Sequence, residues 1–413
     1  KNLIKMNIII CGAGRVGFTI AKLLSEQGHS ITVVDQSSED IQKINDSLDV
    51  KAIVGKASYP SILEKANASE TDMIIAVTRN DEINMLICQI AFSIFNIPKK
   101  IARIRSQDYL NPKFTRVYNK ENLPIDVIIS PEIEIAKSIQ RKLEAPGALD
   151  SVPFADNKIR LLEILIKDDC KSIGIKFNEL TKKYPKLEAN IIGINRDDKF
   201  FIPKKTDSVK NEDKIYIIIN SSQMSETLEA FSHSEKISKK ILIIGGGNIG
   251  FSLAQLIESS DTYIKTEVIE NNKERAEYLA SNLQNITVTN GDGLDNQILE
   301  EVNISDAGYC IAVTEDDEVN ILSSLLAKRA GASVSLTLIN NSNYSSLLTN
   351  IGVDMTIDPK IITISKILEK VRGVKIRNDY SIGDGFGEVI EADIQPNSAL
   401  CNKNLKELSL PKG

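Results

Sequence analysis

The hydrophobic pattern over the first part of the chain alternates between two kinds of segment. Short continuous runs rich in Ile, Val and Ala are followed by longer segments in which apolar residues recur at helical spacing. The runs predict strands at 8–11, 30–35, 51–54, 73–78 and 100–105, and the longer segments predict helices at 16–27, 38–46, 59–65, 81–95 and 131–143. Buried strands that alternate with helices predict a doubly wound parallel sheet.

The pattern changes after Pro146-Gly147. Short strands are expected at 160–166, 191–195, 200–203 and 214–219, with little helix between them. This arrangement predicts a smaller α/β lobe that is separate from the parallel sheet. The polar segment that follows it predicts a linker.

The chain then repeats itself. Three motifs return in the same order at a nearly constant offset: 12–17 as 245–250, 75–84 as 311–320, and 126–131 as 354–359. Three ordered matches are hard to obtain by chance, so we interpret the sequence as a duplication.

The duplication predicts an α/β fold with two tandem Rossmann-like doubly wound parallel sheets, each followed by a small α/β regulatory lobe. The second small lobe stops before counterparts of the last three strands of the first, so it is expected to be truncated. The predicted domains are a nucleotide-binding domain with its crossover helix at 6–146, a small lobe at 147–222, a linker at 223–238, a second nucleotide-binding domain at 239–374, and the start of a second small lobe at 375–413.

Each copy carries a glycine loop between its first strand and its first helix. In the G-x-G-x-x-G loop of the first copy, Gly12 permits the sharp turn and Gly14 lets the backbone approach a pyrophosphate. Gly17 lets the helix lie close to the strand. The helix start would then present free N–H groups and the positive end of its dipole to the phosphates.

An acidic residue follows each loop at the end of the second strand. Asp35 has this position in the first copy, and Glu270 has it after the loop formed by Gly245, Gly247 and Gly250. A carboxylate there accepts hydrogen bonds from ribose hydroxyls and repels a 2′-phosphate, which selects NAD(H) or an adenine nucleotide over NADP(H). The alternative is that the glycines serve only tight packing.

The two copies differ around these loops. Asn248 replaces Arg15 after the second loop glycine. Arg103 and Arg105 end the fifth strand of the first copy, where contact with a phosphate competes with a surface ion pair as their role. The second copy has Leu336-Thr337-Leu338 in this place. We therefore expect two unequal sites.

An acidic pair opens a helix in each copy, Asp81-Glu82 in the first and Asp317-Glu318 in the second. Carboxylates are favourable at a helix N-terminus because of the helix dipole. No histidine or lysine partner accompanies either pair, so a structural role is favoured over acid–base catalysis.

Composition narrows the class of protein. The net charge of −6 argues against a broad nucleic-acid surface, and two histidines exclude a histidine-rich metal site. The five cysteines form no C-x-x-C pair, as expected for small core residues in a reducing compartment. No apolar stretch approaches the roughly 20 residues of a membrane-spanning helix. The chain is therefore expected to be cytoplasmic.

Taken together, these motifs resemble the TrkA family of bacterial Trk-system potassium uptake proteins, which are built from two RCK (KTN) modules. The resemblance rests on the first glycine loop, on 33–35, on 76–84 and on 102–103, and in the small lobe on 193–196, 202–203 and 211–216. The chain departs from the family at Gly55-Lys56, where an acidic residue usually ends the third strand; the second copy keeps Gly291-Asp292.

The resemblance implies a regulatory subunit at the inner face of the plasma membrane. It implies a multimeric ring beneath a membrane subunit of the TrkH or TrkG kind, with NAD(H), ATP or ADP gating potassium entry. The binding residues that it implies are Gly12, Ala13, Gly14, Arg15, Val16, Gly17, Asp35, Thr78 and Arg103 in the first copy, and Gly245, Gly247, Asn248, Ile249, Gly250, Glu270, Asp292 and Thr314 in the second.

Two alternatives stay open. An NAD-dependent oxidoreductase would pair one such lobe with a substrate domain that carries a proton donor, whereas here a small lobe without an obvious donor and a second dinucleotide lobe follow. A regulator of a different potassium channel or of an antiporter would keep the fold and the ligand but change the partner. We therefore expect a nucleotide sensor and not an enzyme.

Overall fold

The chain folds into two compact units, each built from two separate stretches of sequence. The computed structural model describes residues 5–408 apart from 112, 198, 234–239, 261–263, 342–343, 345–347, 349–350, 372–375, 383–386, 395–397, 399 and 405–406. The first unit comprises Lys1–Glu144 with Lys236–Lys370, and the second comprises Ala145–Glu235 with Val371–Gly413.

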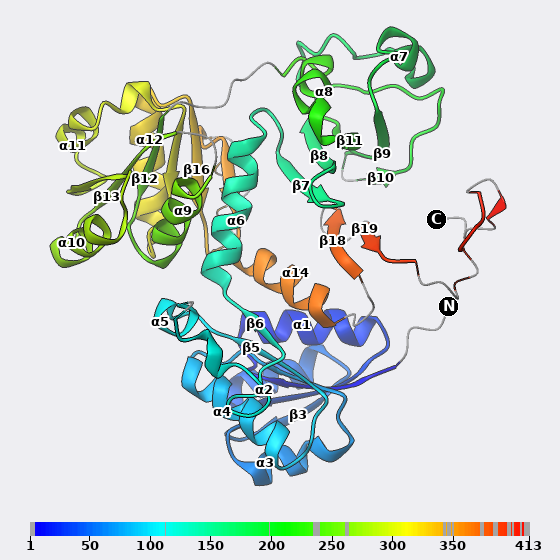
Figure 1. The fold of residues 1–413 in the computed structure, drawn as a ribbon, viewed down its shortest axis with the longest axis vertical. Helices are drawn as coiled ribbons and strands as arrows, with labels where there is room; N and C mark the ends of the chain where they lie inside the picture. The colour runs from blue at the N-terminus through cyan, green and yellow to red at the C-terminus, as the bar shows by residue number, and fades with distance from the viewer. Residues whose placement is uncertain are drawn as a thin grey trace. The chain divides into compact units, whose positions relative to one another are not determined.

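The first unit opens with a six-stranded parallel sheet in the order β3-β2-β1-β4-β5-β6 (Figure 1). Its strands are β1 (Asn7–Cys11), β2 (Ser30–Asp35), β3 (Lys51–Val54), β4 (Met73–Ala76), β5 (Lys99–Arg103) and β6 (Val127–Ile129). Its helices are α1 (Arg15–Glu26), α2 (Ser38–Ser47), α3 (Pro60–Lys65), α4 (Asp81–Ser93), α5 (Gln107–Leu110) and α6 (Pro131–Glu144). This strand order is that of a dinucleotide-binding fold, so the predicted doubly wound sheet is confirmed.

A second parallel sheet in the same unit repeats the plan in the order β14-β13-β12-β15-β16-β17. Its strands are β12 (Lys240–Ile244), β13 (Lys265–Glu270), β14 (Thr287–Asn290), β15 (Tyr309–Ala312), β16 (Val334–Leu338) and β17 (Met355–Ile357). Its helices are α9 (Asn248–Glu258), α10 (Lys273–Asn282), α11 (Asn296–Glu301), α12 (Asp317–Arg329) and α14 (Pro359–Val371). The duplicated sequence therefore gives a duplicated fold.

Two strands of the first sheet end earlier than the hydrophobic pattern predicts. β4 ends at Ala76 and β5 at Arg103, so Arg105 lies in the loop beyond the strand that it was predicted to end. The backbone N–H groups of Arg105 and Ser106 both donate to the carboxylate of Asp81, each at 2.8 Å. These backbone N–H groups therefore bond to the side chain of Asp81 instead of to a neighbouring strand, and the strand ends before them.

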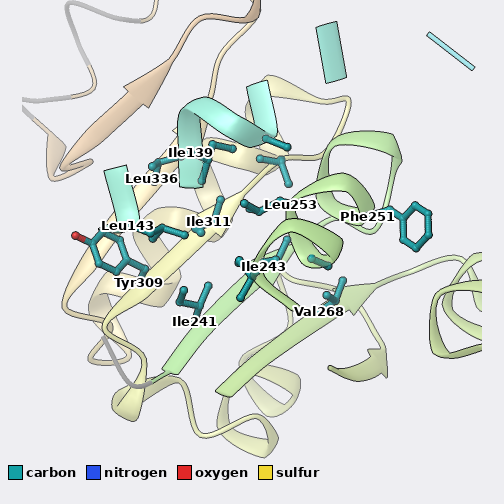
Figure 2. Close-up of a cluster of buried hydrophobic side chains, with 14 of the residues drawn as sticks. Ile139, Leu143, Ile241, Ile243, Phe251, Leu253, Val268, Tyr309, Ile311 and Leu336 are labelled. Carbon is teal, nitrogen blue, oxygen red and sulfur yellow. The ribbon is translucent and has the colours of Figure 1, made fainter. Parts of the chain in front are cut away.

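Helix α6 packs against the second sheet, although it directly follows the first in sequence. Its apolar residues recur every four positions, and Ile135, Ile139 and Leu143 are at most 4% exposed. They join one core cluster with residues of β12, β15, β16 and α9 (Figure 2). Burying each such side chain contributes about 1.5–3 kcal/mol, so this helix ties the two parallel sheets together.

Helix α14, the counterpart of α6, contacts the first half of the unit. The ammonium of Lys99, at the start of β5, donates to the carbonyl of Lys370 near the end of α14. Lys366 of α14 also lies 3.9 Å from a carboxylate oxygen of Glu134 on α6. Each of these two helices thus reaches across to the other copy.

The second unit is built around a five-stranded antiparallel sheet in the order β10-β9-β11-β8-β7. Its elements are β7 (Asp150–Phe154), β8 (Ile159–Leu165), α7 (Phe177–Lys183), β9 (Ala189–Arg196), β10 (Lys199–Phe201), β11 (Lys214–Asn220) and α8 (Met224–Ala230). The sequence reasoning missed β7 and both helices. A segment predicted to be linker therefore contains α8, because Leu228 and Phe231 anchor it in the core of this lobe. Residues 234–238 of that predicted linker lie outside the described residues.

The last part of the chain adds a two-stranded antiparallel ribbon to the same unit. Its strands are β18 (Ile376–Ile382) and β19 (Gly387–Ala392). Ile382 and Val389 pack in one cluster with Val152, Phe154 and Leu161. A lone two-stranded ribbon cannot bury a core by itself, and this packing supplies one.

The helices of the described residues include none that is long and apolar enough to cross a bilayer. Cys11, Cys88, Cys170 and Cys310 are buried and unpaired. Burial raises the pKa of the Cys88 and Cys310 thiols to about 12 in each case. These thiols are packing residues, as the sequence predicted.

Candidate nucleotide-binding sites

The first glycine loop connects β1 to α1 with three geometrically distinct glycines. Gly12 has φ +117°, and a Cβ there would lie 3.0 Å from the backbone of Val77. A Cβ on Gly17 would lie 1.8 Å from the carbonyl oxygen of Gly12. A Cβ on Gly14 would meet nothing within 4 Å. Two glycines are therefore required by the turn and by packing, while Gly14 faces open space at the start of the helix.

The second loop, between β12 and α9, has the same geometry. Gly245 has φ +104°, and a Cβ on Gly250 would lie 1.9 Å from the carbonyl oxygen of Gly245. The middle glycine, Gly247, again faces open space and is the N-cap of α9. The free N–H groups of a helix N-terminus favour anions, so each open glycine marks a place where a phosphate can approach the backbone.

Both acidic residues hold the loop beside them. In the first copy, Asp35 accepts hydrogen bonds from the backbone N–H of Ala13 at 2.6 Å and of Ser37 at 2.8 Å. In the second, Glu270 accepts from Gly246 and Asn272, each at 2.8 Å. A carboxylate oxygen has two lone pairs, so each oxygen keeps capacity for a ribose hydroxyl. The role that these residues were given towards a ribose stays a prediction.

A buried asparagine organises the opposite wall of each site, and sequence reasoning missed it. The side-chain oxygen of Asn84 accepts from Thr78 N at 2.9 Å and from Thr78 Oγ1 at 2.7 Å. Its amide nitrogen donates to the carbonyls of Thr78 at 3.2 Å and Arg103 at 2.8 Å. Asn320 makes the matching four bonds to Thr314 and Leu338. The sequence held a signal, because both asparagines occupy the same position of the repeated motif, and the structure shows that both are fully buried.

The two arginines of the first copy have different surroundings. Arg103 Nη2 donates to the carbonyl of Thr78 at 2.8 Å, and burial lowers the pKa of its guanidinium. The side chain of Arg105 is half exposed and pairs with buried Glu132 of α6, with Nε 2.8 Å from Oε1. Of the two roles weighed for Arg105, the ion pair is therefore present.

The acidic pairs have structural partners. The backbone N–H groups of Asn340 and Asn341 donate to the carboxylate of Asp317, each at 2.8 Å, as the matching groups after β5 do to Asp81. The hydroxyl of Tyr109 donates to Glu82 at 2.9 Å, and that of Tyr344 donates to Glu318 at 3.0 Å. These contacts fix the loops that follow β5 and β16.

Each loop opens into a cavity large enough for a nucleotide. The first, of about 940 Å³, is lined by Gly12, Gly14, Arg15, Val16, Gly17, Asp35, Thr78 and Arg103. The second, of about 1130 Å³, is lined by Gly245, Gly247, Asn248, Ile249, Glu270, Asp292 and Thr314. Ala13 and Gly250, which were also predicted to bind, are buried and line neither of these two cavities; their role stays a prediction.

The sequence relatives of the chain agree with this duplicated architecture. Family models match it in three places, the TrkA-N domain at residues 8–131 and 241–359 and the TrkA-C domain at 161–232. The "Trk system potassium uptake protein TrkA" of Azorhizobium caulinodans is 41% identical over 99% of this chain and 89% of its own length. The chain belongs to the TrkA family.

Solved structures share the fold of this TrkA-family chain at low sequence identity. One is described as "Crystal Structure of the GsuK RCK domain", with a TM-score of 0.62, 16% identity, and coverage of 90% of this chain and 78% of that one. Another is described as "GsuK channel bound to NAD", with a TM-score of 0.62, 16% identity, and coverage of 90% and 64%. At this identity the likeness establishes the fold and nothing more.

The two cavities of the TrkA-family chain share part of their lining. Arg105 and Glu132 line both of them, and the start of α14 contributes Pro359, Lys360 and Thr363 to the first. The exchanged helices α6 and α14 thus begin at the cavities. Among the described residues, no group of three His, Cys, Asp or Glu side chains could hold a metal ion.

Proposed function

We propose that this chain is a nucleotide-binding regulatory subunit of a Trk-type potassium uptake system, and not an enzyme. It binds NAD(H) or an adenine nucleotide in both cavities, at the inner face of the plasma membrane. Its partner is an integral membrane potassium-transporting subunit of the TrkH or TrkG kind. The observation that carries the proposal is the pair of open glycines, Gly14 and Gly247, each at the start of a helix and at the mouth of a cavity.

The comparisons support the transport half of this proposal. The curated relative from Azorhizobium caulinodans is named a potassium uptake protein, and it matches over nearly the full chain. A protein of similar fold is described as a channel with NAD bound. These descriptions concern those proteins, and we extend them to this chain as a proposal.

The contacts of the acidic groups favour sensing over catalysis. The carboxylates at the starts of α4 and α12 are engaged by backbone N–H groups or tyrosine hydroxyls, which suits a scaffold better than a proton shuttle. Two cofactor cavities in one chain, with two histidines in the whole sequence, fit a sensor better than a dehydrogenase.

Helices α6 and α14 connect the cavities to the packing between the two copies, so nucleotide binding can change the conformation of the unit. Glu132 in the first turn of α6 lines both cavities, while the remainder of the helix packs against the second sheet. A nucleotide that binds two arrangements of α6 unequally would shift their populations, and only this difference in affinity can perform work on a channel. We further propose the modular division into 6–146, 147–222, 223–238, 239–374 and 375–413, in which α8 of the segment 223–238 packs on the small lobe, and assembly of several copies into a ring.

Calorimetric titration of the full chain with NAD, NADH, ATP and ADP tests the proposal. The matched variants are Gly14→Asp with Gly247→Asp, and Gly14→Ala with Gly247→Ala. Both positions have ordinary φ values and open space, so both pairs should fold. The aspartates place negative charge where the phosphates approach and should weaken binding at least about tenfold, whereas the alanines should not.

The same variants test the transport role. In cells that hold the membrane subunit but lack their own copy of the regulatory chain, potassium uptake should respond to the unaltered and alanine chains and fail to respond to the aspartate chain. Nucleotide affinity that is unchanged in the aspartate chain would refute the binding sites. Normal uptake without nucleotide binding would refute gating by nucleotide.

A further inference from the structure

The charge of the two cavities differs sharply, although their backbones match. Basic side chains dominate the lining of the first: Arg15, Lys56, Arg79, Arg103, Arg105 and Lys360. Its acidic side chains are Asp35, Asp40 and Glu132. In the second cavity, Arg275 and the shared Arg105 are the basic side chains. Its acidic ones, besides the shared Glu132, are Glu270, Asp292, Glu315, Asp316, Asp317 and Glu318. Asp317 and Glu318 have the identical counterparts Asp81 and Glu82 in the first copy, so the difference in charge comes from the other positions.

The difference is systematic, because it recurs at matched positions of the duplication. At the tip after the fourth strand, Arg79 and Asn80 of the first copy become Glu315 and Asp316 in the second. After the third strand Lys56 becomes Asp292, and at the end of the fifth Arg103 becomes Leu338. Asp40 becomes Arg275, an exchange that runs the other way.

The exchanged helices add to the contrast. Glu132 of α6 and Lys360 of α14 stand at the same place after Pro131 and Pro359. Lys360 lines the first cavity, where its ammonium donates to the carbonyl of Asn340. The second copy thus contributes a cation to the cavity of the first.

We propose that the two cavities select nucleotides of different charge. The first takes a polyphosphate nucleotide such as ATP or ADP, and the second takes a dinucleotide of low net charge, NAD with its cationic nicotinamide ring. This inference rests on the proposed nucleotide-binding function and specifies which ligand each site takes. A triphosphate brings more negative charge than a dinucleotide, so a basic cavity attracts it and an acidic cavity repels it. The acidic groups around Glu315 and Asp316 suit a ring that carries positive charge.

Variants in which one cavity is blocked measure the nucleotide preference of the other cavity by itself; we call them single-cavity chains. Gly247→Asp leaves the first cavity available, and Gly14→Asp leaves the second. Calorimetry in EDTA, so that no divalent cation masks the phosphate charge, should give ATP binding at least about tenfold tighter than NAD in the Gly247→Asp chain. The order should reverse in the Gly14→Asp chain, and ATP binding should weaken with added salt more steeply than NAD binding.

A second experiment reverses the charge of single side chains in a chain whose glycine loops are both unaltered. Arg79 and Glu315 are exposed and occupy matched positions. Arg79→Glu should weaken ATP binding about fivefold and leave NAD binding unchanged, and Glu315→Arg should permit a second ATP to bind. An equal ATP-to-NAD ratio in both single-cavity chains, or equal loss of both ligands in Arg79→Glu, overturns the charge selection. Failure of every nucleotide to bind the unaltered chain refutes the proposed function itself.

Discussion

The two glycine loops reach the same backbone geometry with different side chains. In the first, a short carboxylate, Asp35, accepts from the N–H of Ala13. In the second, the longer Glu270 accepts from the N–H of Gly246. A Cβ at position 246 would lie 2.2 Å from the Cδ1 atom of Leu279 and 3.0 Å from Oε2 of Glu270.

This difference indicates that the residue after the first loop glycine and the acidic residue at the end of the second strand depend on each other. A methyl group at position 246 would press on the longer acid as well as on Leu279, so the residue at 246 and the length of the acid are coupled. The second loop also gains Arg275, whose Nε donates to the carbonyl of Gly246 at 2.8 Å and whose guanidinium lies 4.9 Å from the ring centre of Tyr278. The duplication has thus kept the hydrogen bonds to the loop while the groups that make them diverged.

The largest expected effect on stability concerns the third glycine of each loop, which the two loops share. Gly17→Ala and Gly250→Ala each force a methyl group into the carbonyl of the first loop glycine, which is backbone and cannot move aside cheaply. Each should lower the free energy of unfolding by at least about 3 kcal/mol in urea denaturation. The control pair Gly14→Ala and Gly247→Ala should change it little. Equal stability of test and control variants would contradict the loop geometry.

The next effect concerns the shared asparagine. Asn84→Ala and Asn320→Ala each remove the asparagine that pairs with a threonine N–H and two carbonyls, at a cost of about 2–4 kcal/mol; in the first copy the carbonyl of Thr78 keeps its bond from Arg103. Asn80→Ala removes an exposed helix cap, whose side-chain oxygen accepts from the backbone N–H of Ile83 and which is worth about 1 kcal/mol. Thermal unfolding of the three variants measures the ranking. If Asn80→Ala destabilised the protein most, the hydrogen bonds of Asn84 and Asn320 would not be what stabilises the sites.

The smallest expected effect on stability concerns Gly246, where the second loop differs from the first. Gly246→Ala should destabilise by about 1 kcal/mol, because the flexible end of Leu279 can partly yield. Adding Glu270→Asp shortens the acid that the new methyl group contacts, so the double variant should be more stable than the sum of the two single changes predicts, by about 0.5–1 kcal/mol. A double-mutant cycle in urea gives the coupling. Strict additivity would show that loop and acid vary independently.

Much of the fold could be predicted because local chemistry specifies it. The Ile8–Ile10 run, the loop glycines and the spacing to Asp35 dictate strand, turn and helix within a few residues, and the structure reproduces them. The second unit was predicted less well. β7 contains Pro153, and α8 lies in a polar stretch, so neither has a clear periodic signal. Both elements are stabilised by packing between segments that are distant in sequence.

The sequence by itself determined the duplicated parallel sheets, the position of both loops and the family resemblance, because each depends on residues that are near one another in the chain. Only the tertiary structure showed that α6 packs against the second sheet, that Lys360 of the second copy lines the first cavity, and that Asn84 and Asn320 brace the sites. Nothing in a local pattern states which sheet an amphipathic helix will cover. That choice is made by the complementary apolar surface available when the whole chain has folded.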